Sequence, residues 1–245
     1  MKKVLPFIAF LALAILQNPL SGDTVIDQKF DGPLTSGLWR ASSPEILQSV
    51  VDGQLVMKAD SPDPAAYAVV TLTTSSPMSQ LNFTKKDVTI KLTDLMLKGS
   101  AAAPNQVFLL SLYSDKPGTP ATSALRFRIT PDGTMGSIMI AMINSNAPQQ
   151  SLWQDSVSLP IKSASLTFDS KGIKIAWEDA MGSKTGEVVW PGALSSWENS
   201  SPYLNLETHR SPGTGNVEAT LGGLSVVAIP KPDSASSSDS TPALK

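Results

Sequence analysis

Apolar and polar residues alternate along most of this 245-residue chain, and this alternation limits its fold more than any other feature. The pattern runs from Thr24 to Ile229, and no stretch of eleven or more residues has the three- and four-residue apolar spacing of an amphipathic helix. The alternation predicts fourteen short strands, at residues 24–30, 38–41, 47–51, 54–58, 66–73, 87–97, 106–113, 124–130, 135–143, 164–169, 173–178, 186–190, 203–208 and 216–229.

Three Gly-containing pairs interrupt the alternation where hairpin turns are expected: Asp52-Gly53, Asp132-Gly133 and Lys171-Gly172. Fourteen hairpin-spaced strands in about 205 residues are more than a small immunoglobulin-like sandwich has, and this number suits one large jelly roll. We therefore predict an all-β, two-sheet antiparallel jelly-roll β-sandwich over residues 23–229.

The N-terminus has the layout of a secretory signal. Lys2 and Lys3 precede an apolar run of 13 residues from Val4 to Leu16, and small and polar residues follow up to Gly22. The run is shorter than the ~20 residues of a membrane-spanning helix. We expect residues 1–22 to be removed, no stable membrane insertion afterwards, and a secreted, periplasmic or cell-envelope location.

Composition narrows the chemistry and the partners. The chain has no cysteine, which excludes disulfides, thiol nucleophiles and Cys-ligated zinc, and together with the Met-Lys-Lys opening points to a bacterial exported protein. Its 19 Lys and Arg against 21 acidic residues, with no basic run beyond Lys85-Lys86, argue against nucleic acid as a partner. Residues 230–245 are rich in Ser and Pro, and we expect them to be a disordered tail.

The order of several motifs resembles the concanavalin A-like lectin/glucanase superfamily, including its LamG-like modules. The motifs are Asp27-Gln-Lys-Phe-Asp-Gly-Pro-Leu34 with Trp39 soon after, Val50-Val-Asp-Gly-Gln-Leu-Val56, Leu166-Thr-Phe-Asp-Ser-Lys-Gly-Ile-Lys-Ile175, Tyr203-Leu-Asn-Leu206 and Leu221-Gly-Gly-Leu-Ser-Val-Val-Ala228. The resemblance covers nearly all of residues 24–229. It implies a jelly roll that binds or cleaves glycans.

The chain departs from the catalytic patterns of that superfamily. Family 16 glucanases carry a Glu-x-Asp-x-x-Glu strand, whereas residues 107–113 and 124–130 contain no carboxylate. The alginate-lyase-like branch uses an Arg, a Gln-x-His element and a late Tyr. This chain offers Arg126, Arg128, Tyr203 and His209 without the Gln-x-His.

Alternation also assigns side chains to faces. In residues 203–209, Leu204, Leu206 and Thr208 point to one side, and Tyr203, Asn205, Glu207 and His209 to the other. Arg126 and Arg128 likewise oppose three apolar neighbours. If these strands share a sheet, the arginines meet Glu207 and Tyr203 and form a site for hydroxyls or a uronate carboxylate. The alternative is a solvated sheet face with cross-strand ion pairs.

Aromatic and acidic residues give further candidates. Trp39 and Trp177 are expected in the core, whereas Trp153 and Trp197 lie in polar stretches and are surface candidates for stacking on sugar rings. His209, the only histidine, is expected in a solvated loop. Structural calcium is the one metal considered, with oxygen ligands from Asp27, Asp31, Asp60 and Asp63, although the regular Asp-x-Asp-x-Asp-Gly loop is missing.

Three function classes follow. The leading hypothesis is a secreted, non-catalytic module that binds a polysaccharide or a cell-surface glycan through Arg126, Arg128, Tyr203, Asn205 and Glu207, with Trp153 and Trp197 as further contacts. The second is a polysaccharide lyase or hydrolase that uses the same face. The third is a structural envelope protein with neither binding nor turnover.

Overall fold

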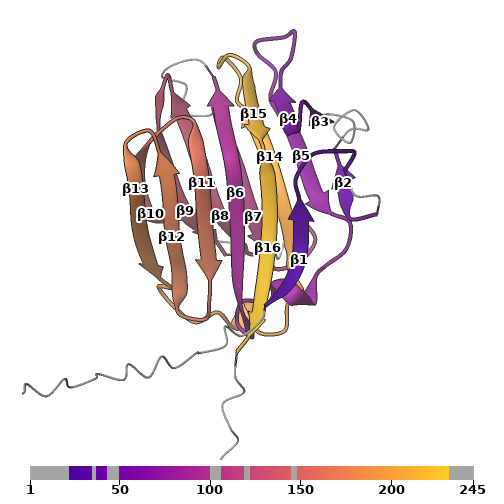
Figure 1. Ribbon diagram of the computed structural model, residues 1–245, viewed down its shortest axis with the longest axis vertical. Coiled ribbons are helices and arrows are strands. Elements are labelled where there is room, and N and C mark those ends of the chain that lie inside the picture. Colours follow the sequence, from indigo (N-terminus) through magenta and orange to yellow (C-terminus); the bar gives the residue numbers. More distant parts are fainter. Residues whose placement is uncertain are drawn as a thin grey trace, which may run out of the picture.

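Sixteen strands form two antiparallel sheets in the computed structural model, which describes residues 22–34, 37–42, 50–99, 106–118, 122–144 and 148–231 (Figure 1). The nine-stranded sheet holds β1(Asp23–Gln28), β3(Val50–Val51), β4(Gln54–Ala59), β6(Lys86–Lys98), β11(Ile161–Phe168), β12(Gly172–Asp179), β13(Gly182–Val189), β15(Val217–Leu221) and β16(Gly223–Pro230). The seven-stranded sheet holds β2(Trp39–Ala41), β5(Ala68–Thr74), β7(Gln106–Tyr113), β8(Ala124–Asp132), β9(Met135–Ile143), β10(Gln150–Ser158) and β14(Tyr203–Arg210).

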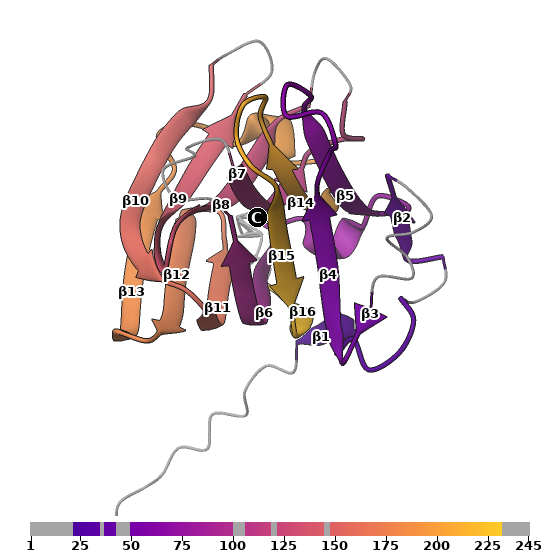
Figure 2. The same cartoon turned by 90° about the horizontal axis from the view of Figure 1, so that it is seen from above.

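The two sheets are stacked as two layers, as the view from above shows (Figure 2). Strand order in the seven-stranded sheet is β10-β9-β8-β7-β14-β5-β2, so β14 comes late in the chain but lies between β7 and β5. Such crossings between strands distant in sequence are the mark of a jelly roll. The predicted all-β, two-sheet antiparallel sandwich is confirmed.

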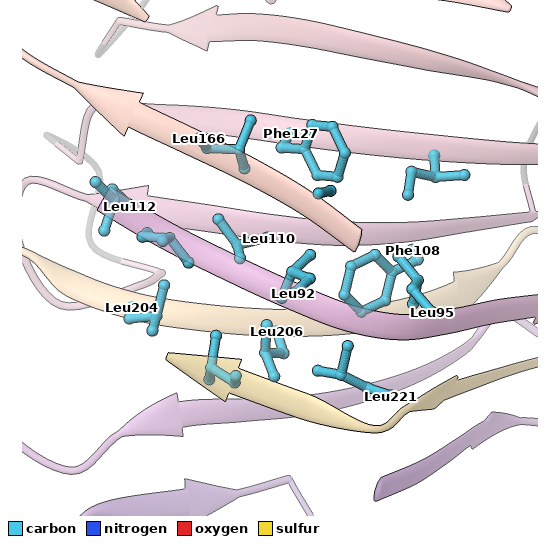
Figure 3. Close-up of a cluster of buried hydrophobic side chains, with 14 of the residues drawn as sticks. Leu92, Leu95, Phe108, Leu110, Leu112, Phe127, Leu166, Leu204, Leu206 and Leu221 are labelled. Carbon is cyan, nitrogen blue, oxygen red and sulfur yellow. The ribbon is translucent and has the colours of Figure 1, made fainter. Parts of the chain in front are cut away.

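Alternating apolar side chains of both sheets fill the space between the layers. Phe108, Leu110 and Leu112 of β7 are fully buried against the core, and so are Leu92 of β6 and Leu166 of β11 (Figure 3). Each large apolar side chain contributes about 1.5–3 kcal/mol when it is buried. A chain without disulfides is held together by this layer.

Strand β6 organises the nine-stranded sheet because two partners share one of its sides. Its first half pairs with β16, and its last residues pair with β15. The change of partner coincides with Asp94, which has φ of 51°, and with Gly222 between the two partner strands. The single strand expected at residues 216–229 is therefore two strands.

One strand was missing from the sequence prediction. β10 lies at the edge of its sheet, and its pairing with β9 shifts register between Ser151 and Trp153. A bulge moves later side chains to the opposite face, so the period-2 pattern breaks inside the strand. The sequence of β10 is also largely polar, because few of its side chains reach the core.

An aromatic cluster closes one end of the sandwich. Trp197, in the short 3-10 helix η3(Ser195–Trp197), is only 1% exposed, and its ring centroid lies 4.8 Å from that of Phe83. Phe83 also contacts Phe168 and Trp190. The prediction that Trp197 lies on the surface is wrong, because four aromatic rings exclude water from a segment whose sequence is rich in serine.

Trp153 is half-buried and packs against the side of the sandwich. Its ring meets the edge of Trp177 with centroids 5.6 Å apart, and a Cβ at Gly186 would lie 2.7 Å from it. Trp177 is on β12 and Gly186 on β13, so Trp153 joins the edges of the two sheets. The core positions predicted for Trp39 and Trp177 are confirmed, at 5% and 2% exposure.

The described chain ends just beyond the sheet. Lys231 donates its Nζ to the carbonyl of Phe83 at 2.9 Å and its backbone N–H to Lys85, so ordered contacts run past the expected boundary at residue 229. The expected signal at residues 1–22 lies outside the described residues except for Gly22. The expected tail at residues 230–245 also lies outside them, except for Pro230 and Lys231. Within the described part of the chain, no helix has the length and apolarity to cross a membrane.

Candidate functional site

The candidate site is built on the outer side of the seven-stranded sheet. We define the site face as the side chains of β7, β8 and β14 that point away from the core. Register places Arg126 opposite Ser111, and Ser111 opposite Asn205; in the next row Arg128 lies opposite Leu109, and Leu109 opposite Glu207. The prediction that the arginines and the polar residues of β14 share one face of one sheet is therefore confirmed.

The middle of the site face is formed by buried side chains of β7, which we call the floor of the site face. Leu109, Ser111 and Tyr113 of β7 point outward, yet they are 3%, 0% and 9% exposed. Arg126 and Arg128 on one side and Glu207 and His209 on the other are half-buried. A ligand would thus meet the charged groups first and the floor of β7 beneath them.

Arg126 is held over Tyr113. Its Nη2 donates to the Tyr113 hydroxyl at 3.1 Å, its guanidinium carbon lies 5.9 Å from the ring centroid, and its Nη1 lies 3.5 Å from Oε1 of Gln149. Its Nε and the hydroxyl of Ser111 are buried without hydrogen-bond partners. These two donors are side by side on the floor of the site face.

Arg128 lies close to a second cation. Its Nε donates to the Thr130 hydroxyl at 3.2 Å. Burial lowers the pKa of Arg128 from its usual value, and the nearby positive charge of Arg126 lowers it further. Both effects disfavour the charged guanidinium, so an anion bound here would relieve the repulsion between the two arginines.

Glu207 pairs with the next outward side chain of its own strand. Its Oε1 lies 2.6 Å from Nδ1 of His209, whose ring centroid is 5.5 Å from that of Tyr67. Burial raises the pKa of Tyr67, and the negative charge of Glu207 raises it further. The arginines share a face with Glu207 and Tyr203 as expected, and on that face Arg126 is hydrogen-bonded to Tyr113 and Glu207 to His209. His209 is in β14, which corrects its expected place in a solvated loop.

Asn205 and Tyr203 continue the site toward the edge of the sheet. Asn205 is 3% exposed, and its Oδ1 accepts a hydrogen bond from the Thr73 hydroxyl at 2.6 Å. Tyr203 borders a hollow of about 400 Å³ between β2, β5 and the segment after β7. The hollow is lined by Arg40, Ala41, Ser42, Thr71, Thr73, Thr74, Ser75, Lys116, Pro117 and Tyr203.

A buried arginine supports the loop that carries Tyr67. Arg210 is 1% exposed, and its guanidinium donates to the carbonyls of Asp63 at 2.8 Å, Thr214 at 3.2 Å, and Ser61 and Pro64 at 3.4 Å. The loop before β5 and the loop after β14 are thus tied together. Tyr67 follows directly on the anchored segment.

The expected calcium ligands do not form a cluster. Among the residues that the structure describes, which include Asp27, Asp31, Asp60 and Asp63, no group of three or more His, Asp or Glu side chains comes together. The Oδ1 of Asp63 accepts the backbone N–H of Ala65 at 2.8 Å, which shapes the loop.

The sequence prediction missed several residues of this region. Arg40 follows Trp39, a core residue, so the alternation alone places Arg40 outward. Tyr113 continues the outward series of β7 in the same way. Tyr67 and Lys116 lie in loops, where no periodicity assigns a direction.

Comparison with solved structures identifies the fold. The chain is similar to SCLam, a non-specific endo-β-1,3(4)-glucanase from family GH16, with a TM-score of 0.56 at 12% identity over 86% of this chain and 92% of that one. Endo-1,3-β-glucanase from Streptomyces sioyaensis also has a TM-score of 0.56, at 10% identity over 87% and 98% of the two chains. Basic winged bean lectin in complex with Tn-antigen gives 0.56 at 8% identity over 86% and 100%.

These matches show the fold: the chain has the jelly-roll β-sandwich architecture of these glucanases and of this lectin, which is the architecture that the motif order suggested. At 8–12% identity the likeness concerns the fold. No protein-family model matches the sequence. No curated protein matches it either.

Proposed function

We propose that this protein is an exported, non-catalytic module that binds a polysaccharide or cell-surface glycan on the site face. One observation carries the proposal. A continuous row of hydroxyl, amide and guanidinium groups crosses the sheet from Arg126 through Ser111, Asn205 and Thr73 into the hollow beside Tyr203. Sugars are recognised by such groups, because each hydroxyl both donates and accepts hydrogen bonds.

Two further features support binding over catalysis. Among the described residues of β7, β8 and β14, two carboxylates point outward: Glu207 and Asp132. Asp132 lies at the end of β8, two strands from Glu207 and four residues beyond Arg128, which shares a row with Glu207, whereas a retaining glycosidase needs two carboxylates about 5 Å apart. The similar folds include a lectin whose structure holds Tn-antigen as well as glucanases. Export rests on residues 1–22 and their resemblance to a secretory signal.

Native gels that contain one polysaccharide at a time would test the proposal. The full chain without residues 1–22 should migrate more slowly in the gel that contains its ligand and normally in the others. Uniform mobility across neutral and acidic polysaccharides would contradict binding and favour a structural envelope protein, for which cross-linking should then reveal a partner.

The hydrogen bond of His209 with Glu207 favours a lyase as the second candidate. Nδ1 of His209 is held by Glu207, and the arrangement of Tyr67 and Arg126 around this pair places a titratable phenol and a cation nearby. In a lyase, a base such as His209 or Tyr67 would remove the proton next to a uronate carboxylate that Arg126 neutralises. The electrons of that C–H bond would form a C=C double bond as the adjacent glycosidic C–O bond breaks, and the oxygen of the leaving sugar would take up a proton.

Turnover separates the lyase from the binding module. A lyase would convert a polyuronate into products with an unsaturated sugar, which absorb in the ultraviolet, and His209→Ala would abolish this signal. Retardation in a gel without any change in absorbance or reducing ends would leave the binding module as the function.

A further inference from the structure

The hollow beside Tyr203 differs in charge from two other hollows on the described surface. Arg40 and Lys116 line it together with hydroxyl groups, and no carboxylate is among its lining residues. A second hollow has Lys58 and Lys98 balanced by Asp60 and Glu218, and a third has Lys174 balanced by Glu187. The whole chain has a formal charge of −2, so this excess of positive charge is local.

The hollow lies at one end of a cross-sheet row that has cations at both ends. Arg40 is opposite Thr73, Thr73 opposite Asn205, Asn205 opposite Ser111, and Ser111 opposite Arg126. Four steps between neighbouring strands, at about 4.8 Å each, put the backbones of the two arginines about 19 Å apart. Neutral groups occupy the positions between them.

In the described part of the chain, two carboxylates lie near this row. Glu207 lies in the adjacent row, and its Oε1 is held by His209 at 2.6 Å. Asp115 is next to Lys116, is exposed, and accepts the backbone N–H of that residue. Among the residues that the structure describes, Arg40, Lys116 and Arg126 therefore outnumber the two carboxylates near the row.

We infer that the ligand is an acidic polysaccharide that lies across the strands, with one anionic group in the hollow at Arg40 and Lys116 and another at Arg126. This inference rests on the proposed glycan binding and names the ligand class. The forked guanidinium donors match a carboxylate or sulfate group, and the half-buried hydroxyls of Thr71 and Thr73 suit neutral parts of the sugar rings. A neutral glucan would offer an anionic group to neither end of the row.

Native affinity gels with three polymers test the ligand class: polygalacturonate, dextran sulfate and a neutral β-1,3-glucan. Both acidic polymers or one of them should retard the chain, and the neutral glucan should not. Retardation by polygalacturonate alone assigns carboxylates, and retardation by dextran sulfate alone assigns sulfates. A single-stranded oligonucleotide serves as a polyanion without sugar-acid groups, and equal retardation by it would overturn the polysaccharide inference.

Variants locate the anionic group. Arg40→Gln and Lys116→Gln should each weaken retardation by the acidic polymer about tenfold, as expected for a lost charged contact. Lys174→Gln, in the balanced hollow on the other sheet, is the matched control and should bind like the natural chain. Arg40 and Lys116 are exposed, and circular dichroism would verify that the variants are folded.

The outcomes separate the inference from the proposed function. If no polysaccharide retards the natural chain, glycan binding itself is wrong. If the neutral glucan retards it as strongly as the acidic polymers, or if Arg40→Gln and Lys116→Gln both bind acidic polymer normally, glycan binding stands and the assignment of an acidic ligand to the hollow is wrong.

Discussion

The sequence pattern was sufficient to predict which face of the sheet Arg126 lies on, but not which residues it contacts. The alternation of residues 125–130 places Arg126 outward, and the register with β7 confirms it. Its partner Tyr113 was not foreseen, because the alignment of two strands depends on turns and bulges as well as on the apolar pattern. The face on which a side chain lies depends on its own strand, whereas its contacts depend on how the neighbouring strands are aligned.

Removing Arg126 should affect binding far more than stability. Arg126→Ala should weaken retention on the ligand about 10- to 100-fold, because it deletes a charged donor, and it should leave the melting temperature nearly unchanged. Lys162→Ala, which breaks an exposed ion pair with Glu178 on the other sheet, is the control and should alter neither. A large drop in melting temperature for Arg126→Ala would make this residue structural.

Glu218 should make stability depend on pH. Its hydrogen bond with Lys58, together with the charges of Lys58 and Lys98, holds the pKa of Glu218 below its ordinary value. The folded-state pKa is thus depressed, so the contribution to stability is present above the unfolded-state pKa and is lost as pH falls through the folded-state value.

Thermal melts of Glu218→Gln would measure this effect. The variant should be less stable than the natural chain by no more than about 1 kcal/mol at neutral pH, since the pair is partly exposed, and the difference should vanish near pH ~3. A difference that persists at low pH would mean that Gln disturbs the packing instead.

At the scale of the element, the hairpin between β11 and β12 forms where Lys171-Gly172 predicted it, but a different residue makes the turn. Asp169 accepts the backbone N–H groups of Lys171 and Gly172 at 2.6 and 2.9 Å, and this makes the turn. Gly172 is already in β12 and has no positive φ. Glycine is needed there because a Cβ would lie 1.7 Å from the carbonyl oxygen of Val188.

Gly172→Ala should therefore destabilise the pairing of β12 with β13. We expect unfolding to become easier by about 1–3 kcal/mol, the usual cost of forcing an extra methyl into a packed site. Gly192→Ala is the control, because nothing lies within 4 Å of its Cβ position, and urea denaturation should leave it close to the natural chain. Equal midpoints for the two variants would contradict the steric explanation.

Elements with regular alternation were predictable, and irregular ones were not. β8 and β14 follow the sequence pattern closely, and the outward residues of the site face on these two strands were therefore predicted correctly. β10 was missed because a bulge interrupts its period. The break at Gly222-Gly223 was missed because apolar alternation continues on both sides of this Gly pair, and only the change of partner on β6 separates the two strands. The Tyr67 loop was missed because its position depends on Arg210, far away in sequence.

At the scale of the whole molecule, the sandwich depends on the aromatic cluster at its end. Trp197→Ala should lower the free energy of unfolding by about 3–5 kcal/mol, since it empties a buried site beside Phe83. Guanidinium denaturation would measure this. Tyr203→Phe, at the half-buried edge of the hollow, should unfold like the natural chain, and a Trp197→Ala variant that did the same would show that the cluster is dispensable.

Arg210 grips its two loops through main-chain carbonyls, which every amino acid supplies. Ser61 and Asp63 also accept backbone N–H groups of the loop with their side chains, but the other side chains of residues 61–66 are not needed to hold the loop in place, and their identities can vary. Such a loop is a natural place to diversify: random substitutions at its exposed positions, selected for binding, could give a family of jelly rolls with new specificities on an unchanged frame. The same freedom would let evolution retune the rim of the site face without disturbing the core beneath it.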